Sequence, residues 1–137
     1  MIENTPAHQR KLIRHAIKAK IEAAVGFLPN AAVYVSRAEV EGLEDFISIY
    51  FDEGDRERTH SSNEAVADLI IRISTKTEPE NADDHLDEIA SYIETAMLDH
   101  SDLPNVWDGY LGGYAYSDSP TGVYSALELK YQIKYND

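Results

Sequence analysis

The stretch YSALELKYQIKYND, residues 124–137, has the most regular pattern in this chain of 137 residues. Its large apolar side chains alternate with polar ones, and they are Leu127, Leu129, Tyr131, Ile133 and Tyr135. Successive side chains of a strand point to opposite sides of the backbone, so this alternation predicts a β-strand with one buried and one wet face. Such a strand must join a sheet, and it raises the question of whether it also contacts a neighbouring subunit.

Four further segments have the composition and alternation of strands. They are AAVYVS around Val33 to Val35, DFISIYF at 45–51, AVADLIIRIST at 65–75 and WDGYLGGYAYSDS at 107–119. Pro120 to Gly122 predicts a hairpin turn between the last of these and the terminal strand. Gly112 and Gly113 indicate a bulge or a close backbone approach within it.

Two segments have the apolar periodicity of amphipathic helices. The first opens at Pro6, closes near Gly26 and Pro29, and carries an apolar stripe of Leu12, Ile13, Ala16, Ile17, Ile21, Ala24, Val25 and Leu28. The second opens in TEPENADD at 77–84, runs to about Met97 or His100, and carries a stripe of Leu86, Ile89, Ala90, Ile93 and Met97. The element order predicts one α+β domain over residues 1–137, with an antiparallel or mixed sheet of about five strands and two main helices on one face.

The segment DEGDRERTHSSN at 52–63 lies between two predicted strands and has no apolar periodicity. It is almost entirely polar and long for a hairpin connection. We therefore expect residues 52–63 to form a mobile hairpin loop.

The composition restricts the classes of function. The formal net charge is -13, which argues against a protein that grips nucleic acid, because phosphate contacts require clustered Lys and Arg. The chain has no cysteine, and no apolar run reaches the roughly 18 residues of a membrane span. We expect a soluble protein of the cytoplasm that does not contact membranes.

The charge is unevenly distributed along the chain. Residues 1–26 contain five basic residues against two acidic ones, and the basic residues are Arg10, Lys11, Arg14, Lys18 and Lys20. Surfaces of opposite sign on one small chain favour head-to-tail self-association. The alternative is a basic helix face that is simply solvated.

No catalytic motif appears at a workable spacing. The richest cluster of titratable groups is NADDHLDEI at 81–89, where Asp84, Asp87 and Glu88 are the candidate metal ligands. A helix start rich in acids is ordinarily a capped, solvated terminus, and we expect no catalytic site and no cofactor. The alternative is hydrated magnesium held by carboxylates at a subunit boundary, where it assists oligomerisation.

Aromatic residues are concentrated in the last third of the chain. They are Trp107, Tyr110, Tyr114, Tyr116, Tyr124, Tyr131 and Tyr135. Strand alternation spreads them over both faces of the terminal hairpin, so about half can enter the core. The remainder favour a protein interface, with cross-strand packing as the alternative.

The run GYAYSDSPTGVYSALELKYQIKY at 113–135 resembles the end of the minor tail protein U family, the tail terminators of lambda-like long-tailed phages. The matching residues are Gly113, Tyr114, Tyr116, Ser125, Leu129, Tyr131, Ile133 and Tyr135. Upstream, FISIYF, LIIRIS and DDHLDEI follow the order of the family. The basic first helix and the amino-acid sequence of residues 52–63 depart from the family pattern.

The resemblance implies a structural virion protein that forms a hexameric ring on the tail tube. The ring would stop tube polymerisation, contact the major tail protein and a head-tail connector protein, and let DNA pass through its lumen without binding it. The protein would be in the host cytoplasm during assembly and in the virion tail afterwards.

The resemblance also implies locations for particular residues. The start of the second helix lies at the ring interface, which makes Asp83 a candidate there. We add Arg10, Arg14 or Lys18 of a neighbour as its basic partner, and Tyr131 and Tyr135 as interface residues of the terminal strand. Residues nearest the lumen or the tube are expected in the polar loop: Asp52, Glu53, Asp55, Arg56, Glu57 and Arg58.

Two other classes of function remain open at this point. A small acidic inhibitor, such as an immunity or DNA-mimic protein, would use the same charge to block a basic partner and would be a stable monomer. A metal-dependent enzyme would need a concave pocket that converges on Asp84, Asp87 and Glu88.

Overall fold

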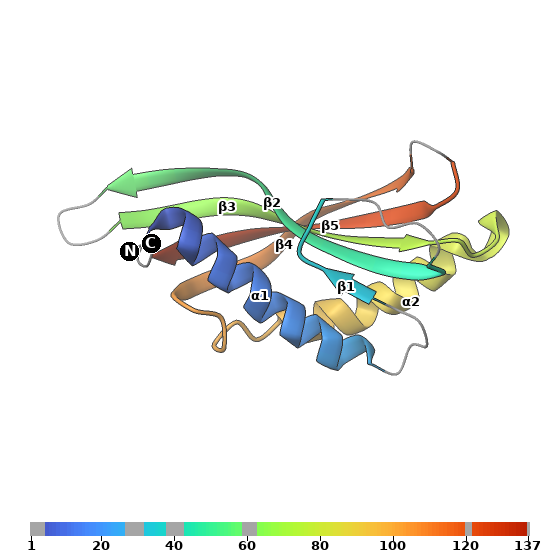
Figure 1. The fold of residues 1–137 in the computed structure, drawn as a ribbon, viewed down its shortest axis with the longest axis horizontal. Helices are drawn as coiled ribbons and strands as arrows, with labels where there is room; N and C mark the ends of the chain where they lie inside the picture. The colour runs from blue at the N-terminus through green and yellow to red at the C-terminus, as the bar shows by residue number, and fades with distance from the viewer. Residues whose placement is uncertain (1–4, 27–31, 38–42, 59–62, 120–121, 137) are drawn as a thin grey trace.

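The structure is a computed structural model, and it describes residues 5–26, 32–37, 43–58, 63–119 and 122–136. Two helices lie against one face of a five-stranded mixed sheet (Figure 1). The elements in chain order are α1 (Pro6–Val25), β1 (Ala32–Tyr34), β2 (Asp45–Arg58), β3 (Asn63–Thr75), α2 (Pro79–Met97), β4 (Val106–Asp118) and β5 (Ser125–Asn136). The predicted α+β class with two helices on one face is confirmed.

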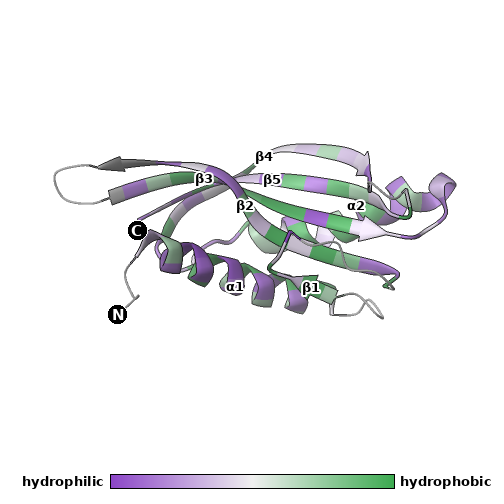
Figure 2. Cartoon of the chain, turned by 45° about the horizontal axis from the view of Figure 1, so that its top comes forward, coloured by the Kyte–Doolittle hydropathy of each residue, from purple (hydrophilic) through white to green (hydrophobic). Residues whose placement is uncertain are grey.

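The terminal strand β5 lies inside the sheet. The strand order is β1-β2-β3-β5-β4, with β1 parallel to β2 and all other pairs antiparallel. The alternating residues predicted to be buried in β5 are all 1 to 3 % exposed, and they face the two helices. Apolar residues also alternate with polar ones along the neighbouring strands (Figure 2), and their buried side chains belong to the same core cluster. The pattern of one buried and one wet face is therefore confirmed.

The helices begin and end where the sequence predicts. In α1 the Oγ1 atom of Thr5 accepts a hydrogen bond from the His8 amide at 3.1 Å, and Pro6 occupies the first turn. The helix ends at Val25, immediately before Gly26. The stripe predicted for α2 is buried, whereas Leu12 of the α1 stripe is 41 % exposed.

The expectation of a loop is wrong for residues 52–58 and for Asn63, which lie in strands. Strand β2 continues past Phe51 to Arg58, and β3 begins at Asn63, which pairs with Arg58. Residues 59–62 lie outside the described part. A bulge between Phe51 and Glu53 shifts the register, and Gly54 then pairs with Ala67. Because backbone pairing needs no apolar side chains, the extended ribbon carries no alternation that the sequence could show.

The predicted bulge of the terminal hairpin is present, and of its predicted turn the structure describes Gly122, while Pro120 and Thr121 lie outside the described residues. The register shifts between Leu111 and Gly113, which leaves Gly112 as the extra residue of a bulge in β4. Gly122 has φ of 73°, a conformation that favours glycine, and its amide donates to the Ser119 carbonyl at 2.9 Å. The glycines therefore have a structural role.

A buried polar contact fixes the start of α1 against the connection between α2 and β4. The Nε2 atom of Gln9 donates to the Pro104 carbonyl at 2.8 Å, and the Nδ2 atom of Asn105 donates to the Oε1 atom of Gln9 at 3.0 Å. Asn105 has φ of 59°.

Neither helix in the described residues is long and apolar enough to span a membrane.

Candidate assembly surfaces

The acidic residues predicted as metal ligands do not converge. Asp84, Asp87 and Glu88 are exposed on α2, and His85 instead contacts Asp45 of β2, with Nε2 3.1 Å from each carboxylate oxygen. Within the described ranges no group of three or more His, Asp or Glu side chains is arranged to hold a metal ion. The structure therefore does not assemble the predicted magnesium ligands into a site.

A basic flank runs along α1, and we define it as Arg10, Arg14 and Lys18. These residues follow one another at four-residue spacing and are half-buried. Each lies one residue after a buried position, so the flank is turned about 100° from the core stripe. Arg10 lines a groove with Arg37, Asp52 and Gly54, which places the flank beside β2.

The basic flank has no ionic partner within the described part of the chain. Lys20 differs: it lies on the other side of α1, and its Nζ is 2.9 Å from the Asp102 Oδ1 atom. Burial lowers the pKa of Arg14, and the positive charge of Arg10 lowers it further. A carboxylate brought to this flank would favour the charged guanidinium and so raise the pKa of Arg14.

The side chains of Tyr131 and Tyr135 do not lie on the surface. They are 3 % and 2 % exposed and pack in the core beneath the helices. Burial raises the pKa of Tyr131, and the nearby Glu94 carboxylate raises it further. The expectation that these side chains meet a neighbouring subunit is corrected, because a strand between β3 and β4 directs its apolar face to its own helices.

The open edge of the sheet carries the exposed aromatic residues. Strand β4 pairs with β5 on one side, and the described residues place no strand on its other side. Its large side chains are 40 to 69 % exposed, and they are Trp107, Tyr110, Leu111, Tyr114 and Tyr116. The concentration of aromatic residues in the last third of the sequence indicated this surface. The strand order decides which of those aromatic residues are exposed and which are buried.

A groove of about 200 Å³ lies between α2 and β4, and we call it the α2–β4 groove. Its lining residues are Asp87, Ala90, Glu94, Tyr114, Tyr116, Leu127 and Leu129. The rings of Tyr114 and Tyr116 are 5.9 Å apart and nearly perpendicular, and the Tyr116 hydroxyl donates a hydrogen bond to the Asp87 carboxylate. That bond, with lesser contributions from burial and the negative charge of Asp87, raises the pKa of Tyr116 to about 12.

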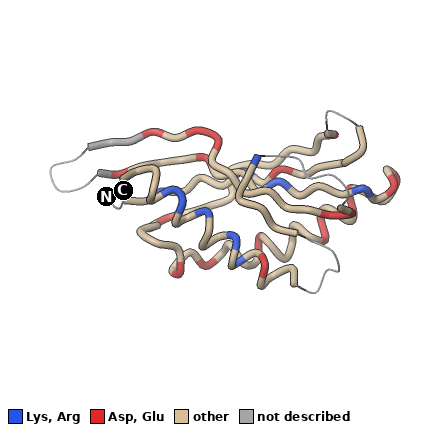
Figure 3. The backbone as a smooth tube through the Cα atoms, viewed as in Figure 1, with Lys and Arg blue, Asp and Glu red and all other residues tan. Residues whose placement is uncertain are grey.

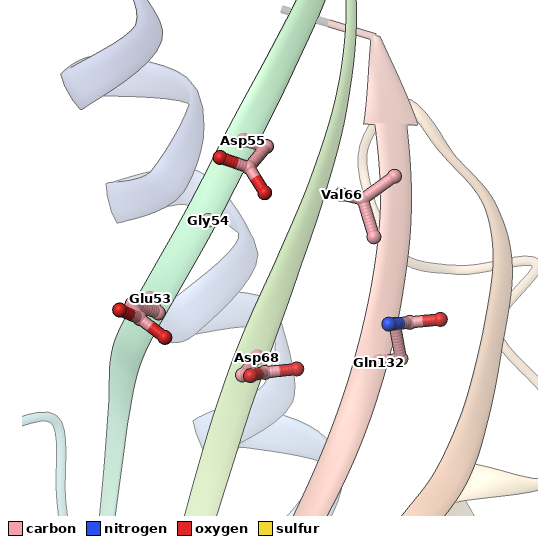
Figure 4. Close-up of a pocket in the computed structure, with 6 residues that line it drawn as sticks. All are labelled: Glu53, Gly54, Asp55, Val66, Asp68 and Gln132. Carbon is pink, nitrogen blue, oxygen red and sulfur yellow. The ribbon is translucent and has the colours of Figure 1, made fainter.

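A second groove lies on the sheet face opposite the helices, at the distal end of the β2–β3 hairpin (Figure 4). It measures about 240 Å³ and is lined by three carboxylates, those of Glu53, Asp55 and Asp68, together with Gly54, Val66 and Gln132. The Nζ atom of Lys130 is 3.7 Å from the Asp68 Oδ2 atom, and Arg10 and Arg37 line an adjoining groove that also includes Glu53 and Asp55. We call Glu53, Asp55 and Asp68 the acidic hairpin face.

The structure places the remaining residues of the polar segment only in part. Asp52 is exposed beside the bulge of β2. The side chains of Arg56, Glu57 and Arg58 lie outside the described part of the structure. Asp83 is exposed on the first half of α2, on the helix that carries Asp87.

The two helices differ in charge: α2 carries several Asp and Glu residues and no Lys or Arg, whereas α1 carries mainly Lys and Arg (Figure 3). Asp and Glu also lie along the distal part of β2. The predicted charge asymmetry is therefore present in three dimensions, with the basic flank beside β2 and the α2–β4 groove at the opposite edge of the sheet.

Comparison with known proteins identifies the family. The chain resembles a solved structure described as the virion of a native gene transfer agent particle, with a TM-score of 0.56 over 93 % of this chain and 96 % of that chain, at 13 % sequence identity. That likeness concerns the fold alone. No curated protein matches the sequence. The family model for phage minor tail protein U matches residues 8–135, and the chain therefore belongs to that family.

Proposed function

We propose that this protein is a tail terminator, which forms a hexameric ring on the end of a phage tail tube. The observation that carries the proposal is the family match over residues 8–135. Membership of a phage minor tail family gives the chain a structural role in the tail and a location in the virion. The proposed ring stops polymerisation of the major tail protein and presents its other side to a head-tail connector protein.

The distribution of charge supports a ring. A heterologous contact joins one surface of a subunit to a different surface of the next, and it closes into a ring when the rotation between subunits allows. This chain has such a pair of unlike surfaces, with the basic flank of α1 beside β2 and the acids of α2 nearer the opposite edge. We place Asp83 at the subunit interface, facing a basic residue of the neighbouring α1.

The acidic hairpin face supports passage of DNA through the ring. Its three carboxylates share one groove, and the Nζ atom of Lys130 lies 3.7 Å from one of them, that of Asp68. Carboxylates that face a channel repel phosphate and keep DNA from adhering to the wall. We place Glu53, Asp55 and Asp68 at the lumen or at the tube contact.

The terminator function is tested by adding the purified protein to tube protein that is polymerising. Electron microscopy should show tubes that stop growing, each with a ring at one end, and light scattering should detect a mass six times that of the chain. Tubes that reach the same lengths with and without the protein would refute the proposal. Repeating the measurement with and without magnesium tests whether the ion assists assembly.

The lumen assignment has a separate test. Changing Glu53 and Asp55 to lysine should make the assembled ring retain duplex DNA in a gel-shift experiment, because the channel wall then attracts phosphate. The same charge reversal at Glu80, which is exposed in the first turn of α2, and at Asp99, which is exposed just after that helix, is the matched control. Equal DNA retention by the two variants would place the acidic hairpin face outside the lumen.

A further inference from the structure

We infer that the α2–β4 groove of one subunit receives the basic flank of α1 from a second copy of the chain. The inference rests on the proposed ring and specifies which two surfaces meet. It adds Asp87, Glu94, Tyr114 and Tyr116 to the interface on one side, opposite Arg14 and Lys18 on the other.

The groove has the chemistry to hold an arginine or lysine side chain. Asp87 and Glu94 supply carboxylates, and Tyr114 and Tyr116 supply two nearly perpendicular rings with 5.9 Å between their centroids. Long basic side chains pack their methylene groups on apolar surface and keep the charged head on a carboxylate or over an aromatic ring. The combination of acid and exposed tyrosine therefore favours a cationic side chain over a purely apolar one.

The basic flank lacks a carboxylate partner of the kind that the α2–β4 groove could supply. Arg14 is half-buried, stands beside the like charge of Arg10 and has no carboxylate partner within the described residues. The overall charge of -13 makes nucleic acid an unfavourable partner for this stripe. An acidic and aromatic surface is the favourable partner, and this chain carries one.

The two surfaces lie at opposite edges of the molecule. The helices pack on each other, with α1 also on β1 and β2 and α2 also on β3, β4 and β5, and the basic flank lies on the β2 side of α1. The strand order places β1 and β4 at the two edges of the sheet. Within one chain the basic flank is therefore too far from the α2–β4 groove to bind in it. Contact between copies is therefore head to tail, as a ring requires.

The absence of cysteine allows a cross-linking test on the full chain. One variant carries Lys18→Cys on the basic flank, and the other carries Ser91→Cys, an exposed position one helical turn from Asp87 on α2. The two are mixed and treated with a short bis-maleimide. The control replaces Lys18→Cys with Leu12→Cys, which is also exposed on α1 but lies on the other side of the core stripe.

Several-fold more mixed dimer from Lys18→Cys than from Leu12→Cys supports the inference. Equal yields from the two positions overturn it. Charge exchange gives a second readout: Arg14→Glu in the first chain and Glu94→Arg in the second should each lower the yield, and the two together should restore it. Additive losses without restoration would also contradict the contact, because a true partner pair compensates.

A chain that carries both Lys18→Cys and Ser91→Cys separates this inference from the proposed function. Cross-linked products that stop at a closed ring support both. A ladder that continues past six copies keeps the contact and overturns the ring. A wild-type ring detected by light scattering, with no cross-linked products from the double variant, overturns the contact alone.

Discussion

The hydroxyl group of Tyr116 on β4 donates a hydrogen bond to the carboxylate of Asp87 on α2, and this bond joins the edge strand to the helix beside it. The two residues are 29 positions apart in the chain. Both residues line the α2–β4 groove, so the bond between them holds together two sides of the proposed interface.

The titration of Tyr116 tests this bond. Its pKa is raised from 10.0 to about 12, chiefly because the Asp87 carboxylate accepts the phenolic proton in a hydrogen bond. Carbon-13 NMR of the labelled tyrosine ring should therefore give a midpoint near pH 12, and Asp87→Asn should return it towards 10. The raised pKa means that the folded chain holds the proton more tightly, so this bond stabilises the fold below pH 10 and is lost as the pH rises through 12. A midpoint unchanged by Asp87→Asn would show that the carboxylate is not the cause.

A glycine at the distal end of the hairpin is required for packing. A Cβ atom on Gly54 would lie 3.0 Å from the Ala67 Cβ atom and 3.1 Å from the Val66 carbonyl oxygen. We expect Gly54→Ala to lower the free energy of unfolding by about 1 to 3 kcal/mol, the usual cost of overpacking. Gly113→Ala is the matched control, since nothing lies within 4 Å of a Cβ atom there. Equal urea midpoints for the two variants would contradict the packing of β2 on β3.

The central sheet should respond strongly to loss of volume. Ile71 of β3 is 0 % exposed within the main core. Ile71→Ala should lower the free energy of unfolding by about 2 to 5 kcal/mol, because it leaves a cavity that the sheet cannot close. Val123→Ala, at a position that is 55 % exposed, should change the same quantity by less than about 0.5 kcal/mol. Denaturant unfolding measures both, and a loss below about 1 kcal/mol at Ile71 would place it outside the core.

The contact between Gln9 and Asn105 can be separated into its side-chain and backbone parts. Asn105→Gly removes the hydrogen bond to Gln9 but accepts the backbone φ of 59° without strain, whereas Asn105→Ala loses the bond and is strained as well. We expect Asn105→Ala to be the less stable of the two by about 1 kcal/mol in thermal or denaturant unfolding. The reverse order of stability would show that the backbone conformation at this position carries no cost.

Ring formation should weaken as salt is added. The surfaces proposed to meet have opposite charge, and ions screen such pairs when part of the surface is solvated. Light scattering at increasing sodium chloride should show the mass falling from that of the ring towards that of the chain. A mass that is independent of salt would indicate an interface held by apolar contacts, such as the exposed aromatic residues of β4, with little contribution from the basic flank.

The sequence by itself determined the elements whose one-sided burial repeats with a regular period. The alternation in β5 and the stripe of α2 predicted the buried residues correctly, because the period of a strand or a helix decides which side chains share a face. Turn chemistry likewise located the hairpin at Gly122 and the bulge at Gly112. These features depend on residues close together in the chain.

The tertiary structure decided everything that depends on which elements become neighbours. The sequence did not show that β5 lies between β3 and β4, and this order sends Tyr131 and Tyr135 to the core and leaves Tyr114 and Tyr116 exposed. It did not show that β2 continues to Arg58, because a paired ribbon with Gly54 on its inner face has no apolar period. Nor did it bring Asp87 to Tyr116, since packing of α2 on the edge of the sheet is a contact between distant segments that no local pattern records.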